Sequence, residues 1–332
     1  MRFFTFKGLL LTTIFMLLGC LSIQAEDDDL ITKQVTVKLD EAGTLPDKIG
    51  SAKKYKITNL KIIGEINGTD WRMIRDMAGR NVSHDETEGN LSELDLSDAS
   101  IVPGGDYYIT CAYFGYPSKI HTSHQVIGDL AFEGCSGLTS LKLPSDIRLI
   151  GRHAFEGCSG LTSITLPSGV TEIGSSAFYG CSGLTSITLP SGVTWIGHSA
   201  FEGCSGLTSI TLPSGVTEIG KSAFANCSGL TSIYVYAEKM PKLRTNMFDG
   251  CDAKKCTVYV PKGTYDDYWL SEFGYFENIV EFDPTGINNV ITSNDAKELS
   301  RYSVNGQRLS APTKGLNIVK YSDGSVKKVA VQ

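Results

Sequence analysis

The chain has few charged residues and no cluster of positive ones. Lys, Arg, Asp and Glu together make up 20% of the 332 residues, and the formal net charge is −6. Binding to a phosphate backbone depends on clustered Lys and Arg, so nucleic acid is not an expected partner. The hydrophobic content of 41%, combined with this low charge, is typical of a folded chain rather than a disordered one.

The sequence patterns of catalytic and metal sites are also missing. There is no HExxH, no GxSxG, no tight CxxC pair and no arrangement of paired catalytic carboxylates. The five His are scattered, and the two that share a segment, His121 and His124, are more typical of a solvated loop than of a metal site. We therefore expect no enzyme activity, no cofactor and no metal ion.

Residues 1–25 are predicted to be an export signal. A positively charged start precedes an apolar stretch, residues 8–23, that is too short and too interrupted for a membrane span. Two processing alternatives remain. Cleavage after Ala25 would give a secreted chain, whereas residues 17–20 resemble a lipoprotein box in which Cys20 would carry an outer-membrane lipid anchor. Both alternatives place the mature chain outside the cytoplasm, either at the cell surface or secreted.

What the sequence does contain is a 23-residue repeat. The segment GCSGLTSITLPSGVTEIGSSAFY, residues 157–179, recurs almost unchanged at 180–202 and 203–225, and looser copies occupy 134–156 and 226–249. Such self-similarity indicates a solenoid, in which each coil buries its faces against its neighbours and the end copies differ because they meet other surfaces.

The spacing of apolar residues predicts which side chains of a coil point inward. Alternation around Ile164 and Leu166 predicts a strand with one buried face, and Pro167 begins a turn. A second short extended piece follows before the next coil begins. The expected core of the copy that starts at Gly157 consists of Leu161, Ile164, Leu166, Val170, Ile173, Ala177, Phe178 and, from the next copy, Cys181.

The cysteines follow the same period. Cys135, Cys158, Cys181, Cys204 and Cys227 are 23 residues apart, and Cys251 follows after 24. Residues in register lie above one another with parallel Cα–Cβ bonds, a geometry that disfavours disulfides. We therefore predict a column of reduced, buried thiols that act as small apolar side chains. Cys251 and Cys256 are the one pair that could bond near the end of the solenoid.

The repeat also explains a misleading match to the P-loop pattern GxxxxGK[ST] at Gly215–Ser222. A phosphate-binding loop needs a preceding strand and a following helix. The sister copies have GVTEIGSS and GVTWIGHS at this place, and Val216 and Ile219 are expected core residues. The match is an accident of the repeat.

The pattern LxxLxL with a recurring "IGxxAFxGCxxLTSIxLPxxV" resembles the BspA-like leucine-rich repeats of bacterial surface proteins, over residues 126–250. The N-terminal phrases INGTDWRMIRDMAG and LDLSDASIVPGGDYY are similar to that family too. The resemblance implies a mainly β, right-handed leucine-rich-repeat solenoid of 23-residue coils with N- and C-terminal caps. It also implies surface location and adhesion to host or neighbouring-cell proteins.

The resulting division of the chain has six parts. Asn305-Gly306 and Asp323-Gly324 predict hairpin turns in the last part, which is expected to be a small antiparallel β module similar to a sorting tail. The parts are a signal peptide at 1–25, an N-terminal cap with irregular leucine-rich repeats at 26–105, an aromatic loop insertion at 106–127, regular repeats at 128–250, a C-terminal cap at 251–284, and a linker with the β tail at 285–332.

Within the N-terminal part, Thr69 or Asp70 is expected to cap a short helix through Trp71, Ile74 and Met77. In the C-terminal part, residues 256–261 are expected to form the final strand, followed by a helix from Tyr265 to Phe273.

The outward residues of the predicted strands are the candidate ligand-binding face, because solenoids commonly bind partners on such extended surfaces. They form two columns: Ser140, Ser163, Ser186, Ser209 and Ser232, and Lys142, Thr165, Thr188, Thr211 and Tyr234. A candidate aromatic patch lies in the insertion and consists of Tyr107, Tyr108, Tyr113, Phe114 and Tyr116. The alternative is that these rings pack beneath the loop onto the solenoid.

The favoured function is protein–protein interaction or adhesion, with extracellular host or bacterial proteins as partners. One alternative is a structural spacer without a specific ligand. Another is a glycan-binding accessory protein, for which Trp195 and the aromatic patch are the only expected platforms.

Overall fold

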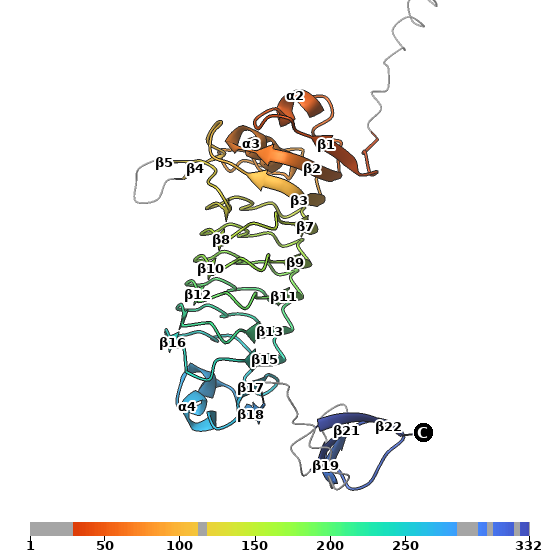
Figure 1. The fold of residues 1–332 in the computed structure, drawn as a ribbon, viewed down its shortest axis with the longest axis vertical. Coiled ribbons are helices and arrows are strands. Elements are labelled where there is room, and N and C mark those ends of the chain that lie inside the picture. The colour runs from red at the N-terminus through yellow and green to blue at the C-terminus, as the bar shows by residue number, and fades with distance from the viewer. Residues whose placement is uncertain (1–28, 112–117, 284–297, 304–307, 322–325, 332) are drawn as a thin grey trace, which may run out of the picture.

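Figure 1 shows the computed structural model of the chain, in which stacked coils form an elongated body. The structure describes residues 29–111, 118–283, 298–303, 308–321 and 326–331. The predicted signal peptide and Cys20 lie outside these residues. The architecture confirms the predicted β solenoid, and two parallel ladders run along it.

One ladder, the long sheet, runs along one side of the stack (Figure 1). Its strands pair in parallel and in register, so that Ser163, Ile164 and Thr165 lie beside Ser186, Ile187 and Thr188. In spatial order the strands are β1 (Val35–Lys38), β2 (Asn59–Ile66), β3 (Glu93–Ile101), β7 (Ser140–Lys142), β9 (Ser163–Thr165), β11 (Ser186–Thr188), β13 (Ser209–Leu212), β15 (Ser232–Val235), β17 (Thr257–Pro261) and β18 (Asn278–Phe282).

The other ladder, the short sheet, contains the second extended piece of each coil. Every strand has two residues, of which the second is buried in the core, except in the last strand, β16, where Leu243 packs against the core but is only partly buried. The strands are β6 (Val126–Ile127), β8 (Leu149–Ile150), β10 (Glu172–Ile173), β12 (Trp195–Ile196), β14 (Glu218–Ile219) and β16 (Lys242–Leu243).

The predicted core of each regular coil is confirmed, and phenylalanine forms its spine. All eight expected core residues of the copy that starts at Gly157 are buried. The rings of Phe155 and Phe178 stack with centroids 5.0 Å apart, and those of Phe178 and Phe201 with centroids 5.2 Å apart. The column begins at Phe132 and continues to Phe248, with parallel rings at every step. Identical side chains at a fixed period therefore do lie over one another.

The cysteine column is present as well. The thiols of this column are buried and unpaired, and each of those from Cys158 to Cys251 donates a hydrogen bond to a Phe carbonyl oxygen of the preceding coil. In the coil of Cys181, the Sγ–O distance to Phe155 is 3.1 Å. Burial raises the pKa of Cys181 to about 12, because the thiolate would lose its hydration. Cys251 and Cys256 are also free thiols.

Glycine permits the coils to touch. A Cβ atom on Gly174 would lie 2.6 Å from the backbone of Gly151 in the previous coil, closer than any side chain can approach. Gly157 serves a different purpose, since its φ of 71° lies in the left-handed region that glycine adopts without strain. The four copies between residues 134 and 225 thus depend on glycine both for a turn and for close stacking.

The N-terminal region is an irregular continuation of the same solenoid, as predicted. Between β2 and β3, the chain forms helix α3 (Gly68–Met77) instead of a short-sheet strand. The short helix α2 (Leu45–Ile49) lies between β1 and β2. The predicted cap, Thr69 or Asp70, lies two or three residues after the observed one. Asn67 caps α3 by accepting a hydrogen bond from the Thr69 amide, and Asp70 completes a capping box.

Trp71 extends the phenylalanine spine beyond the first regular coil. Its ring lies 5.3 Å from that of Phe132, and its Nε1 donates to the carbonyl oxygen of Ala131. At this end of the spine the first coil therefore packs against α3, while its strand β7 pairs with β3 of the N-terminal region.

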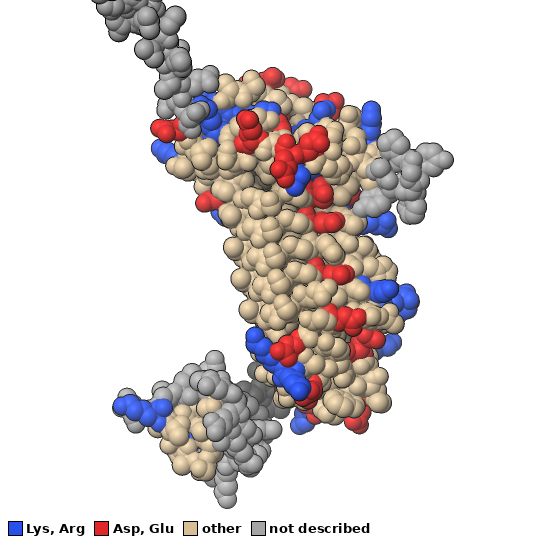
Figure 2. All heavy atoms as spheres, turned by 180° about the vertical axis from the view of Figure 1, so that it is seen from behind, with Lys and Arg blue, Asp and Glu red and all other residues tan. Residues whose placement is uncertain are grey.

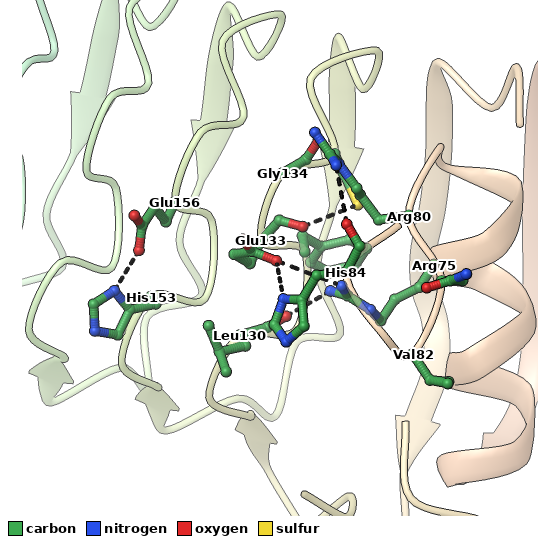
Figure 3. A network of polar contacts seen from close by, with 12 residues as sticks. Arg75, Arg80, Val82, His84, Leu130, Glu133, Gly134, His153 and Glu156 are labelled. Carbon is green, nitrogen blue, oxygen red and sulfur yellow. Dashed lines mark hydrogen bonds and ion pairs between the residues drawn. The ribbon is translucent and has the colours of Figure 1, made fainter. Parts of the chain in front are cut away.

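Arg75, one helical turn beyond Trp71, makes the main polar contact at this junction (Figure 3). Its side chain is fully buried, and Nη1 donates to the carbonyl oxygens of Leu130 and Ala131 at 2.6 and 2.9 Å. Nη2 lies 3.7 Å from Glu133, whose carboxylate also meets Nδ1 of His84 at 3.0 Å. A charged network thus joins α3 to the first coil.

The C-terminal end differs from the prediction in two respects. Residues 256–261 do not form the final strand, because β18 adds one more parallel strand to β17. The expected helix is also shorter, since α4 (Tyr265–Trp269) ends and a 3₁₀ turn, η2 (Glu272–Tyr275), follows. Phe273 and Phe276 then close the phenylalanine spine against Phe248, at 5.2 and 4.8 Å.

The tail forms the predicted small antiparallel sheet. Its strands, in spatial order, are β20 (Arg308–Leu309), β19 (Glu298–Ser303), β21 (Gly315–Tyr321) and β22 (Val326–Val331). The two predicted hairpin turns lie outside the described residues. In the insertion, β4 (Ile109–Cys111) and β5 (Ser118–Ile120) form a two-stranded antiparallel sheet.

Candidate binding surface

The outer face of the long sheet, which we call the strand face, brings the ten predicted residues together. Ser140, Ser163, Ser186, Ser209 and Ser232 are consecutive partners in one column. The second column consists of Lys142, Thr165, Thr188, Thr211 and Tyr234, one from each successive strand. The side chains from β7 to β11 are exposed, and the four from β13 and β15 are half-buried.

Along the regular repeats, the strand face carries almost no charge. Between Lys142 in β7 and the aromatic residues of β15, its outward side chains are Ser and Thr. Figure 2 shows a band without charged residues along this side of the repeats, whereas Lys, Arg, Asp and Glu gather on the other side and over the N-terminal region. Along the regular repeats, the strand face therefore presents hydroxyl groups and not charges.

The N-terminal end of the strand face is the exception. Lys142 lies opposite Asp95 of β3, and its Nζ is 2.9 Å from the carboxylate. Burial by itself would raise the pKa of Asp95, but hydrogen bonds from Ser97 and Lys142 outweigh it and lower the pKa to about 2. Lys142 is therefore held in an ion pair and extends from it towards solvent.

The C-terminal end of the strand face is aromatic, a feature that the sequence analysis missed except for Tyr234. The Tyr234 ring stacks on Tyr259 of β17 with centroids 4.5 Å apart. Phe282 of β18 meets Tyr234 and Tyr236 edge-on, at 6.4 and 5.2 Å. We call these four half-buried residues the aromatic end. The sequence places Tyr234 and Tyr259 25 residues apart, which differs from the 23-residue period. Only the register of β15 and β17 shows that they are neighbours.

In the candidate aromatic patch of the insertion, the alternative is confirmed at Tyr108, because this ring packs beneath the insertion and is not part of an exposed patch. This ring is buried beside Trp71, and its hydroxyl donates to the carbonyl oxygen of Asp129 at 2.7 Å. Tyr107 is half-buried, with the cationic groups of Arg72 and Lys119 over its ring at 5.3 and 4.6 Å. The other members, Tyr113, Phe114 and Tyr116, lie outside the described residues.

The segment with the P-loop pattern has none of the required context. Its Glu218 and Ile219 form a short-sheet strand, and residues 221–226 form turns where a P-loop would begin a helix. Within the part of the chain that the structure describes, no group of three or more His, Cys, Asp or Glu is arranged to hold a metal ion. No helix among those residues is long and apolar enough to cross a membrane.

A family model described as BspA type leucine-rich repeat region matches residues 125–255 in six copies. These residues cover the short-sheet strands, the stacked Phe and Cys columns and the strand face from β7 to β15. Residues 125–255 are a BspA type leucine-rich repeat region. A search of curated proteins gave no match to the chain.

Several solved structures are similar to the chain. A leucine-rich repeat protein from Bacteroides ovatus is 35% identical over 52% of this chain and 44% of its own, with a TM-score of 0.39. The T. pallidum leucine-rich repeat protein TpLRR is 28% identical over 46% of this chain and 80% of its own, with a TM-score of 0.35. The pneumococcal vaccine antigen PcpA is 16% identical over 70% of this chain and 61% of its own, with a TM-score of 0.38. The chain thus spans less than half the length of the Bacteroides ovatus protein.

Proposed function

We propose that the chain is an exported binding protein, displayed at the cell surface or secreted, whose strand face adheres to proteins of host or bacterial surfaces. The observation that carries the proposal is the in-register, nearly uncharged Ser and Thr face between Lys142 and the aromatic end. Rigid extended faces of this kind suit partners that are themselves long or repetitive. The family match and the composition of residues 1–25 support the surface location.

The energetic centre of such an interaction would be the aromatic end. Binding energy in protein interfaces is concentrated in a few aromatic and Arg residues, whereas small hydroxyl side chains mainly provide complementarity. Tyr234 and Tyr259 are held rigidly by stacking and have hydroxyl groups for hydrogen bonds. The Ser and Thr columns would then extend the contact along the partner.

A pull-down from extracellular-matrix and bacterial-surface fractions tests the proposal, followed by titration of the captured protein. The double variant Thr165→Arg, Thr188→Arg places two bulky charges on exposed positions of the strand face. We expect it to weaken binding at least tenfold. The matched control is Ser159→Arg, Ser182→Arg, which places the same charges one coil apart on exposed turns.

Equal binding by the two double variants would show that the strand face is not the site. If no protein is captured saturably, a structural spacer becomes the better explanation. Mass spectrometry of the mature N-terminus separates the lipid-anchored from the secreted form, because only the former carries acyl groups on Cys20.

A further inference from the structure

The three nearly identical copies of the repeat differ from one another on one side of the solenoid. Copies 157–179, 180–202 and 203–225 have the same outward Ser and Thr on the strand face. They differ at three positions per copy, of which the first lies in the short sheet and the others in the turns that follow it. These positions are 172, 195 and 218; 175, 198 and 221; and 179, 202 and 225. Recognition specific to one coil therefore belongs to the short-sheet side.

Trp195 is the most distinctive of these differences. It occupies the outward position of β12, between Glu172 of β10 and Glu218 of β14. A hollow of about 360 Å³ adjoins it, at the small end of the ~300–1,000 Å³ range of ligand sites. Its lining includes Trp195, Leu149, Gly151, Arg152, Glu172 and Asp129. We call this the Trp195 hollow.

Glycine gives the hollow its floor. Gly151 and Gly174 line it, and a Cβ on Gly174 would be 2.6 Å from the backbone of Gly151, so no side chain can occupy this place. The walls are the half-buried side chains of Leu149 and Trp195, which stand two coils apart. Because the floor is backbone in contact with backbone, the hollow is preformed and rigid.

The hydrogen-bonding groups of the hollow belong to side chains. The backbone of the short sheet is already paired, since Gly174 donates to Ile150 and Gly197 donates to Ile173, both at 2.8 Å. An extended peptide therefore finds no free strand edge here. In contrast, Glu172, which is next to Trp195 in the short sheet, and Arg152, which lines the hollow from the coil of Leu149, are exposed and offer an acceptor and donors. A ligand with one apolar face and many hydroxyl groups fits this arrangement.

We propose that the Trp195 hollow binds a pyranose unit of a neutral oligosaccharide, with the indole of Trp195 against the apolar face of the sugar and Glu172 and Arg152 bonding its hydroxyl groups. The hollow lies on the short sheet, and the strand face is the outer side of the long sheet. The inference is thus independent of the proposed adhesion function. A chain altered at Thr165 and Thr188 is expected to keep its saccharide binding.

Calorimetric titration of the full chain with chitotetraose, cellotetraose and maltotetraose tests the proposal. We expect saturable binding of at least one of them at millimolar concentration. The variant Trp195→Leu should weaken it about tenfold, which corresponds to ~1.4 kcal/mol. Leucine is the natural residue at the equivalent position of the first regular coil, Leu149, so this variant is expected to fold normally. Glu172→Gln should weaken binding less, because it keeps an acceptor oxygen.

Trp269→Phe is the matched control, since Trp269 is the exposed Trp of α4 and lies outside the hollow. Its saccharide binding should equal that of the unaltered chain. The proposal is overturned if none of the three saccharides binds at millimolar concentration. It is equally overturned if Trp195→Leu binds as well as the unaltered chain, or if Trp269→Phe abolishes binding.

Discussion

The regular coils and the junction between α3 and the first coil bury similar aromatic rings by different contacts. In the coils, every Phe meets another Phe and every thiol from Cys158 to Cys251 meets a Phe carbonyl oxygen, so one set of contacts recurs. At the junction, Phe132 meets Trp71, and the carbonyl oxygens of Leu130 and Ala131 receive hydrogen bonds from buried Arg75. Each of these junction contacts occurs once in the described chain.

The difference shows how a repeat is ended. A coil in the middle satisfies its backbone and its apolar faces with copies of itself, whereas the first coil must be met by a surface of different sequence. A helix has no strand edge to offer, so side chains such as Arg75 and Trp71 supply the missing donors. Middle and junction should therefore respond differently to substitution.

The largest expected effect is in the middle. Phe178→Ala removes a fully buried ring that stacks on both neighbours and should lower the free energy of unfolding by about 3–5 kcal/mol. Urea unfolding followed by circular dichroism measures it. The control is Tyr179→Glu, an exposed position at which the next copy has Glu202, and no change is expected. A loss below ~1 kcal/mol for Phe178→Ala would contradict the stacked spine.

The junction should depend on charge as well as on packing. Arg75→Met keeps most of the apolar volume but leaves the Leu130 carbonyl oxygen without this donor and Glu133 without a buried cation. We expect a loss of about 3 kcal/mol in urea unfolding. Arg72→Met on the same helix removes a partly exposed ion pair with Asp106 and should cost less than ~1 kcal/mol. Equal stability of the two variants would mean that the buried guanidinium is not needed.

The ion pair between Asp95 of β3 and Lys142 of β7 joins the N-terminal region to the first regular strand. Its contribution to the free energy of unfolding should depend on pH. Because the pKa of Asp95 is lowered to about 2, its stabilisation is complete above the ordinary Asp pKa of ~4 and is lost as the pH falls towards 2. Asp95→Asn should lower stability by about 1–2 kcal/mol at pH 7, and the difference should shrink between pH 4 and 2. A difference that is constant with pH would assign the effect to packing and not to charge.

The smallest effect is expected from the thiols of the middle, which should not react. Burial raises the pKa of Cys135 to about 11 and that of Cys181 to about 12, so at pH 8 few thiolates exist and none is accessible. Iodoacetamide should leave them unlabelled in the native chain and label them all in denaturant without reductant. A Cys20→Ser variant removes the thiol of the predicted leader. Rapid labelling of the native variant at Cys181 would show that the column opens.

The sequence predicted best where it repeats. Leu161, Ile164 and Phe178 were assigned to the core from spacing alone, and the two columns of the strand face were assigned from alternation. A shift by one coil brings each residue to the position of its equivalent in the next copy. The sequence of one copy and the length of the period therefore define all contacts between the regular coils. Helix α3 and the antiparallel tail were also expected, because capping residues and turn dipeptides act locally.

Prediction failed where segments of unlike sequence meet. The burial of Tyr108 depends on Asp129 and Trp71, which are 21 residues after it and 37 before it. Strand β18 carries no leucine-rich-repeat phrase and pairs because β17 leaves an edge beside it. The aromatic end and the burial of Arg75 were missed for the same reason. Both depend on contacts with a distant coil, and no local sequence pattern shows which carbonyl oxygen or ring that coil will place there.

By itself, the amino-acid sequence determined the repeating interior: the stacked rings, the thiol column and the two outward rows of hydroxyl groups. It could do so because neighbouring coils are copies, and a copy needs no information beyond its period. Only the tertiary structure decided the ends and the surface sites. It placed Trp71 and Arg75 on the first coil, and it gathered Tyr234, Tyr259 and Phe282 at the last strands. It also showed that side chains and backbone of four successive coils leave a hollow beside Trp195: the period aligns Leu149, Glu172 and Trp195, but whether space stays open between them depends on how their side chains pack.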